Sequence, residues 1–184
     1  RGTIGGSGGG CLTPIDVVKF TAAFGSWIKQ RAQKEHVKIV LGRDARISGD
    51  MVRQLAVGTL QGLGIDVLDL GLSTTPTVEV AVPLENADGG IVLTASHNPK
   101  QWNALKLLNE KGEFINAQDG AEVLTMAKQD AYSFAEVDAL GSYTQEDTYI
   151  QKHIQAILDL PLVDVALIRS TRFKVVVDAV NSTG

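Results

Sequence analysis

Short apolar runs alternate with longer amphipathic stretches in the first part of the chain. Three runs rich in β-branched residues have the length of buried strands: residues 37–42, 65–70 and 90–95. Three stretches carry apolar positions at helical spacing: residues 13–31, 50–62 and 75–82. Two of these stretches begin with Thr-Pro, which is typical of an N-cap followed by the first helical residue. Alternating strands and helices predict a parallel sheet covered by helices.

The pattern changes in the second half of the chain. Residues 104–108 and 113–115 are apolar and flank Asn-Glu-Lys-Gly, which has the length and the glycine of a hairpin connection. An antiparallel strand is therefore predicted at the sheet edge. Two more helices are predicted: residues 117–130 and 144–158. The second opens with Thr144 and Asp147, a pair that resembles a capping box. Together these elements predict an α/β fold, a three-layer α/β/α sandwich with a mixed, mainly parallel sheet.

The two ends of the chain are less regular. The opening RGTIGGSGGG is predicted to be a loop, because each glycine loses more backbone entropy on ordering than any other residue. Its abrupt start at Arg1 suggests an interior stretch with upstream residues missing. Residues 173–178 have the composition of a buried strand. The chain is expected to divide near residues 160–170, into one domain at 1–165 and the start of a second at 166–184.

Composition and charge narrow the range of functions. Of 184 residues, 44% are hydrophobic and 21% are charged, which is the balance of a globular chain. The formal net charge of -4 leaves no broad basic surface, so neither nucleic acid nor a membrane is expected as a partner. Cys11 is the single cysteine and cannot form an internal disulfide, which favours a cytoplasmic location.

Two of the predicted strands end in polar loops that could carry chemistry. Arg43 and Arg46 follow the first strand, and Ser96 directly follows the third. The carboxyl ends of parallel strands lie on one rim of a sheet, where α/β proteins bind their ligands. Guanidinium groups suit phosphate, and a serine hydroxyl beside them could accept a phosphoryl group.

Ser96 has two other interpretations. Ser, Asn and Pro commonly build turns that have no chemical role. A serine-hydrolase nucleophile is less favoured, because the stretch lacks the glycines of the G-x-S-x-G elbow. His97 is also a poor base for Ser96, since neighbouring side chains in extended structure point to opposite faces.

Three motifs resemble those of a known enzyme family. Thr-Ala-Ser-His-Asn-Pro at residues 94–99, followed by Asn103 and Lys106, resembles the phosphoserine signature of the α-D-phosphohexomutase superfamily. Gly-Arg-Asp-Ala-Arg-Ile-Ser-Gly at residues 42–49 resembles that family's loop after its first strand, and the opening Arg-Gly resembles its early Arg-Gly. The superfamily includes phosphoglucomutase, phosphomannomutase and phosphoglucosamine mutase. The chain therefore resembles the N-terminal domain of such an enzyme.

The resemblance implies catalytic roles for four residues. Ser96 would carry the phosphoryl group, giving it to a hexose monophosphate and taking one back from the bisphosphate intermediate. Lys106 would be the general acid/base near the sugar hydroxyl, with Arg1 and His97 supporting proton transfer and charge. Hexose 1-phosphate and 6-phosphate would be interconverted, with hexose 1,6-bisphosphate as activator.

The other implied roles concern the phosphate and its metal ion. Asn98 would hold the serine loop, while Arg43 and Arg46 would shape or neutralise the phosphate site. Mg²⁺ would bind the phosphate on Ser96 and further ligands beyond Gly184. The isolated chain is expected to be inactive, because downstream domains II–IV would supply the metal loop and grip the sugar. Glucose, mannose and glucosamine phosphates all remain candidate substrates, and a non-catalytic sugar-phosphate-binding module remains an alternative.

Overall fold

A five-stranded sheet lies at the centre of the fold. The structure is a computed structural model, and it describes residues 1–5 and 10–183. The strand order is β7-β5-β3-β4-β8. The strands are β3 (Val37–Arg43), β4 (Ile65–Leu72), β5 (Gly89–Leu93), β7 (Leu105–Leu108) and β8 (Tyr143–Gln145). Only β7 is antiparallel to its neighbour, which confirms the predicted mixed, mainly parallel sheet.

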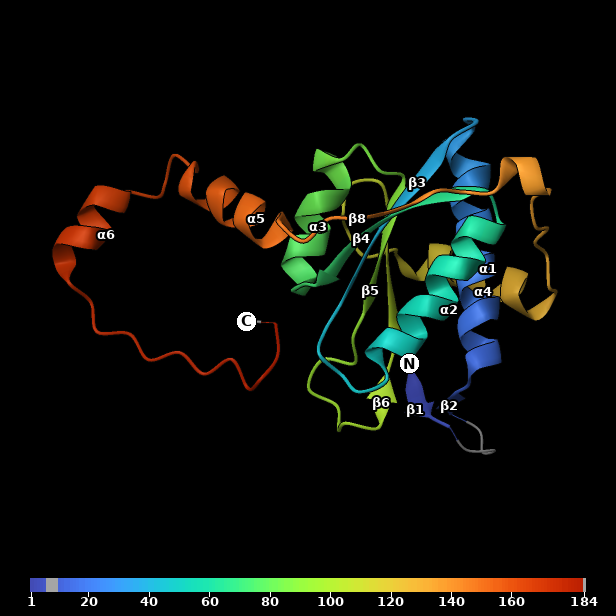
Figure 1. Ribbon diagram of the computed structural model, residues 1–184, viewed down its shortest axis with the longest axis horizontal. Helices are drawn as coiled ribbons and strands as arrows, with labels where there is room; N and C mark the ends of the chain where they lie inside the picture. Colours follow the sequence, from blue (N-terminus) through green and yellow to red (C-terminus); the bar gives the residue numbers. More distant parts are fainter. Residues whose placement is uncertain (6–9, 184) are drawn as a thin grey trace.

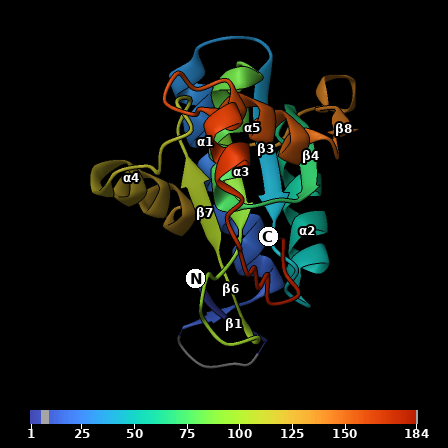
Figure 2. The ribbon, with the colours of Figure 1, turned by 90° about the vertical axis from the view of Figure 1, so that its left-hand side faces the viewer.

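Helices cover both faces of this sheet (Figure 1). On one face lie α1 (Pro14–Ala32), α2 (Gly49–Gly62) and α4 (Ala117–Lys128), and on the other lie α3 (Thr75–Leu84) and α5 (Tyr149–Leu158). In Figure 2, α3 and α5 lie in front of the strands. The predicted three-layer α/β/α sandwich is therefore confirmed.

Alternate residues of the central strand β3 point into two separate cores. Ile39 and Leu41 join a cluster with residues of α1 and α2, whereas Val40 packs with Val78 and Val82 of α3. All five are fully buried. Side chains of a strand alternate between its faces, so β3 is covered on both sides, which explains its nearly continuous apolar sequence.

A second, three-stranded sheet includes part of the opening segment that the sequence predicts to be a loop. β1 (Gly2–Ile4) pairs in parallel with β2 (Cys11–Leu12) and in antiparallel register with β6 (Trp102–Asn103). The loop prediction for residues 1–10 is wrong at residues 2–4, and its part at residues 6–9 lies outside the described chain. A Cβ at Gly2 would come within 2.7 Å of the backbone of β2. This glycine permits close strand packing, and composition cannot reveal a partner about 100 residues away.

The predicted helix at residues 144–158 begins later than expected. Residues 143–145 form β8, which pairs with the outer edge of β4. The capping box of Thr144 and Asp147 is not formed, and Thr148 is the N-cap of α5. Strand pairing across the sheet therefore outweighs the local cap signal in this segment.

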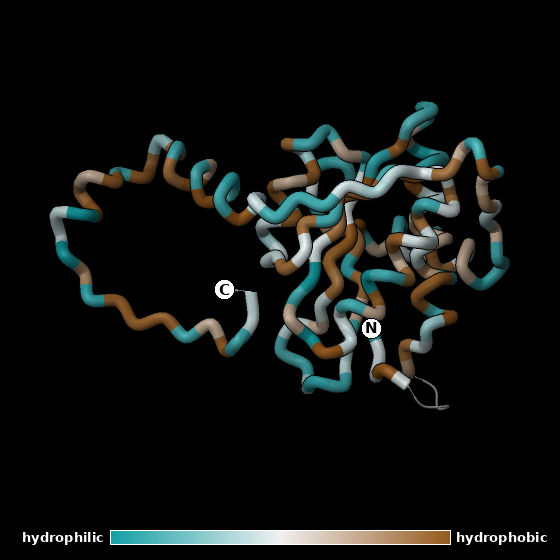
Figure 3. Tube along the Cα trace, viewed as in Figure 1, coloured by the Kyte–Doolittle hydropathy of each residue, from teal (hydrophilic) through white to brown (hydrophobic). Residues whose placement is uncertain are grey.

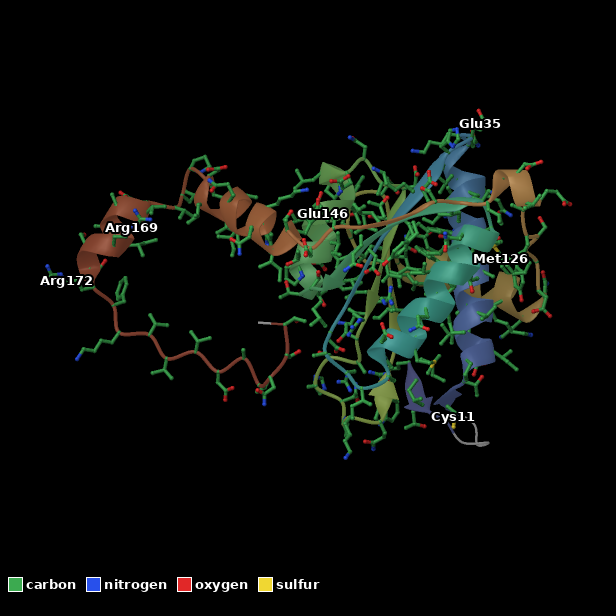
Figure 4. The ribbon with its side chains drawn as sticks, in the orientation of Figure 1. Cys11, Glu35, Met126, Glu146, Arg169 and Arg172 are labelled. Atoms are coloured by element: carbon green, nitrogen blue, oxygen red, sulfur yellow. The ribbon has the colours of Figure 1, made fainter. Side chains whose placement is uncertain are left out.

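Hydrogen bonds fix the turn between β8 and α5. Glu146, labelled in Figure 4, accepts from both the hydroxyl and the N–H of Thr148, and these bonds lower the pKa of Glu146 to about 2. Tyr149, which is 2% exposed, donates its hydroxyl to Glu85, the residue that caps the C-terminus of α3. Burial and this hydrogen bond raise the pKa of Tyr149. The first turn of α5 is thereby attached to α3.

The prediction of a strand at residues 173–178 is wrong. In the described part of the chain this segment pairs with no strand, and Val175, Val176 and Val177 are 74%, 98% and 79% exposed. In Figure 3 this hydrophobic segment lies apart from the sheet, on the stretch of chain that returns from the far left toward the C-terminus. A strand requires a neighbour for its backbone hydrogen bonds, and apolar composition does not supply one.

Three other segments of the described chain form only short elements. The second strand of the predicted hairpin, at residues 113–115, is reduced to one bridge between Leu108 and Phe114. The remaining short helices are η1 (Val137–Ala139) and α6 (Val165–Thr171). Figure 4 shows Arg169 and Arg172 at α6, in the part of the C-terminal segment that lies farthest from the sheet.

No helix among the described residues is both long and apolar enough to cross a bilayer. The division into residues 1–165 and 166–184 stays a prediction.

Thr21 of α1 provides a test of core packing. Its side chain is 0% exposed, and its hydroxyl has no hydrogen-bond partner in the described structure. An unpaired buried hydroxyl costs roughly 1–3 kcal/mol, and valine has nearly the same shape. We expect Thr21→Val to raise the free energy of unfolding by about 1 kcal/mol in a urea titration. The control is Thr59→Val, which loses a hydrogen bond to Leu55 and should give no gain. A less stable Thr21→Val chain would contradict this interpretation.

Candidate active site

The polar loops that follow β3 and β5 lie side by side at one end of the sheet (Figure 1). The two strands are parallel neighbours, with Arg43 opposite Leu93. Beyond this pair, the N–H of Asp44 donates to the carbonyl of Leu93 at 3.1 Å. The two loops therefore leave the sheet together, as expected for the carboxyl ends of parallel strands.

Ser96 lies exposed just after β5 in a left-handed backbone conformation, with φ of 55°. This conformation costs a residue other than glycine roughly 1–2 kcal/mol. Hydrogen bonds hold the turn: the N–H of Ser96 donates to Thr94 Oγ1 at 3.0 Å, and the side chain of Asn98 donates to the carbonyl of Ala95 at 2.7 Å. The turn therefore presents the serine hydroxyl to solvent.

This geometry also bears on the hydrolase interpretation. Ser96 adopts a left-handed turn without the elbow glycines, so their absence does not argue against a nucleophile. A base is nevertheless lacking, because within the described chain no histidine shares a hydrogen bond with the Ser96 hydroxyl. His97 is exposed beside it. A serine hydrolase needs a base within hydrogen-bond reach of its nucleophile, and the described residues do not place one there.

Arg46 connects the two loops. Its Nη1 donates to the carbonyls of Pro99 at 2.9 Å and Trp102 at 3.0 Å. Its Nη2 donates to the carbonyls of Ser96 at 2.7 Å and Asn98 at 2.8 Å. The Arg46 side chain is only 10% exposed. One guanidinium group from the loop after β3 therefore binds four backbone oxygens of residues 96–102, which we call the serine loop.

Asp44 and Thr94 extend this network to the serine backbone. Asp44 Oδ2 accepts from Arg46 Nε at 3.1 Å and from the Thr94 hydroxyl at 2.6 Å, and its Oδ1 accepts from the N–H of Arg46. The same Thr94 hydroxyl accepts from the N–H of Ser96. Sequence reasoning did not select Asp44 or Thr94 as site residues. Their spacing could have indicated them, because Asp44 stands two residues before Arg46 and Thr94 stands two residues before Ser96.

Arg43 lies against the beginning of α2. Its Nη1 donates to the carbonyl of Asp44, and a Cβ added at Gly49 would be 3.3 Å from that nitrogen. Its Nε is buried and has no hydrogen-bond partner in the described structure. Hydrogen bonding by Arg53 and the nearby charge of Arg43 lower the pKa of Asp50. The Arg43 guanidinium group is thus directed toward α2, and no hydrogen bond joins it to Ser96 in the described residues.

Lys106 lies on β7, and Arg1 directly precedes β1. Lys106 is opposite Val92 in the pairing of β7 with β5, and its ammonium group is 5.7 Å from the ring centroid of Phe114. Arg1 precedes β1 and lines a largely apolar cavity of about 400 Å³ between α1, β7 and α4. Within the described chain, neither side chain forms a hydrogen bond with Ser96.

Comparison with known proteins identifies the family of the chain. Residues 1–133 match the family model described as phosphoglucomutase/phosphomannomutase, alpha/beta/alpha domain I. A phosphoglucomutase/phosphomannomutase of Thermococcus kodakarensis is 37% identical over 173 residues, which cover 94% of this chain and 37% of the relative. A phosphoglucosamine/phosphogalactosamine mutase of Sulfurisphaera tokodaii is 33% identical over 174 residues, with the same coverage of both chains.

A solved structure shows the same fold. It is a phosphoglucomutase/phosphomannomutase family protein from Burkholderia thailandensis, with a TM-score of 0.68 and 27% identity over 86% of this chain and 35% of that one. The fold and these matches together define a phosphohexomutase domain. The chain belongs to the phosphoglucomutase/phosphomannomutase family and contains its domain I. It spans just over a third of the length of the curated relatives that it matches.

The left-handed conformation of Ser96 predicts an unusual order of stability between two variants. Glycine relieves the strain at this position and alanine does not, so Ser96→Gly should be more stable than Ser96→Ala by about 1 kcal/mol. At a position with negative φ, alanine would instead be equal or better. Urea unfolding of the two variants measures the difference. Equal stability, or a more stable Ser96→Ala chain, would contradict the conformation.

Proposed function

We propose that Ser96 carries a phosphoryl group during the interconversion of hexose 1-phosphates and 6-phosphates. Membership of the family supports the reaction class. The observation that carries the assignment to Ser96 is its exposed hydroxyl on a hydrogen-bonded turn at the carboxyl end of β5. A core position for this hydroxyl would have excluded the role.

Each transfer exchanges one bond to phosphorus for another. The bond between phosphorus and Ser96 Oγ breaks, and a bond from phosphorus to a sugar hydroxyl oxygen forms. The sugar hydroxyl gives its proton to a base, and Ser96 Oγ regains a proton. The second transfer reverses this exchange with the other phosphate of the bisphosphate. Such reactions depend mainly on positioning and charge stabilisation.

We assign the remaining roles to five further residues. Lys106 is proposed as the general acid/base, because its flexible stem extends from β7, next to the strand that leads to Ser96. Arg1 and His97 would assist with charge, and Arg43 would neutralise phosphate. Asn98 would keep the serine turn closed through its hydrogen bond to the backbone.

The described residues do not by themselves form a metal site. They contain no group of three or more His, Cys, Asp or Glu side chains that could hold a metal ion. Mg²⁺ prefers octahedral oxygen ligation, and a phosphate on Ser96 would supply only part of it. The proposal therefore assigns the other Mg²⁺ ligands to residues beyond Gly184, and hexose 1,6-bisphosphate remains the proposed activator.

The proposed substrate is a hexose phosphate, and the sugar stays open. The relatives' names include glucose, mannose and glucosamine enzymes, and the described chain shows no built sugar site that would choose among them. We infer that domains II–IV of the full-length protein complete this site. The single cysteine, Cys11, supports a cytoplasmic location.

The role of Ser96 can be tested on the full-length protein. After incubation with glucose 1,6-bisphosphate, intact mass and phosphopeptide mapping should find one phosphate, on Ser96. Ser96→Ala should lose both this phosphate and mutase turnover, whereas Ser133→Ala, an exposed serine remote from the site, should keep them. Phosphate on another serine would refute the role. Full turnover by Ser96→Ala would also refute it, because the reaction would then proceed without this hydroxyl, whereas a wild-type protein that binds hexose phosphate without turnover would favour the non-catalytic module.

A second experiment concerns the chain of residues 1–184 alone. It should show no mutase turnover with glucose, mannose or glucosamine phosphate, because metal ligands and sugar contacts are expected from later domains. Activity should return when the same chain is part of the full-length protein. Measurable turnover by residues 1–184 would show that the site is complete within them.

A further inference from the structure

All the hydrogen-bond donors of Arg46 are already engaged. A guanidinium group has five N–H donors. Four bind the carbonyls of the serine loop, and the fifth, on Nε, binds Asp44. The side chain is 90% covered. Arg46 cannot donate to a phosphate without releasing part of the loop.

The carbonyls that Arg46 binds surround the serine turn. The Ser96 carbonyl belongs to the residue with the left-handed backbone, and those of Asn98, Pro99 and Trp102 follow it along the loop. These contacts fix where the chain goes after the strained residue. Conformations that cost free energy persist only where the surroundings hold them.

Thr94 holds the same turn from the other side. Its hydroxyl donates to Asp44 and accepts from the N–H of Ser96, so the peptide before Ser96 is fixed to the carboxylate that also binds Arg46. Linked hydrogen bonds of this kind polarise and strengthen one another. The N–H and the carbonyl of Ser96 are therefore both bound to one network.

We propose that Arg46, supported by Asp44 and Thr94, is a positioning residue that holds the Ser96 hydroxyl in place for phosphoryl transfer and binds no substrate phosphate itself. This inference rests on the proposed function of Ser96. A group that fixes the reacting atom changes kcat, whereas a group that binds the substrate equally in ground state and transition state changes KM. Displacement of a reacting atom by about 1 Å can cost about 100-fold in rate.

The test uses the full-length protein and a pair of buried threonine variants. Thr94→Val removes the hydroxyl and keeps the shape, and Thr94→Ser keeps the hydroxyl. We expect Thr94→Val to lower kcat by about 100-fold with little change in KM. Thr94→Ser should restore most of kcat. The matched control is Thr59→Val in α2, a buried threonine whose hydroxyl bonds only within its helix, and it should behave as wild type.

Arg46→Lys provides the second arm. Lysine keeps the charge but cannot reach four carbonyls from one planar fork, so kcat should fall with KM unchanged. Thermal unfolding verifies that each variant is folded. If Arg46→Lys does not fold, the comparison of Thr94→Val with Thr94→Ser decides the test. Faster hydrogen exchange of the Ser96 amide in Thr94→Val is an expected readout that is independent of turnover.

The possible failures are distinguishable. A raised KM at unchanged kcat in Arg46→Lys, or wild-type kcat in Thr94→Val, would overturn the positioning role while leaving the role of Ser96 intact. A wild-type protein with no mutase turnover, or with phosphate on another serine, would overturn the proposed function and the positioning role together.

Discussion

The parallel pairing of β3 with β5 is the constraint on which the site depends. It sets Arg43 opposite Leu93 and continues through the hydrogen bond from Asp44 to Leu93. A slip by one residue would turn every side chain of β3 to the opposite face. Because β3 is buried on both faces, such a slip would exchange the residues of its two cores. The hydrophobic packing of β3 therefore determines which residues begin the two polar loops.

Arg46 then fixes the positions of the two neighbouring loops relative to each other. The β5 loop contains a residue in an unfavourable conformation, and its carbonyls at Ser96, Asn98 and Pro99 lie outside any strand. Unpaired carbonyls that are shielded from water cost free energy. Arginine can satisfy four of them at once because its donors form a rigid planar fork, whereas the ammonium group of lysine is a compact point charge. The chemical identity of this residue therefore matters as much as its charge.

The sequence predicts the alternating helices and strands well, and it predicts poorly the strands that pair with distant parts of the chain. Residues 13–31, 37–42, 50–62 and 65–70 form the expected helices and strands because their periodicity and caps are local signals. β1 and β8 were not predicted because each depends on a partner distant in the sequence, β6 for one and β4 for the other. Residues 173–178 show the reverse error, since a strand-like composition has no partner in the described chain.

The candidate site likewise has features that the sequence predicts and features that it does not. The motif around Ser96 could be found from its residue types and from its place at the end of a strand. The positive φ of Ser96 could not, because serine gives no local signal for a left-handed turn of the kind that glycine gives. The network of Asp44, Thr94 and Arg46 joins two loops about 50 residues apart, so it became visible only with the sheet register.

Engagement of Arg46 changes how charge around Ser96 must be assigned. Its donors are used by the loop and its charge is offset by the ion pair with Asp44, so the charge of a phosphate on Ser96 has to be balanced largely by other groups. Arg43 is directed toward α2 and lies near Asp50, and the Lys106 ammonium lies over Phe114. Neither is engaged with Ser96 as the chain stands. We infer that the cations of this domain balance only part of the phosphate charge. The domain therefore fixes the geometry of the serine turn, and most of the balancing charge comes from groups that bind to it.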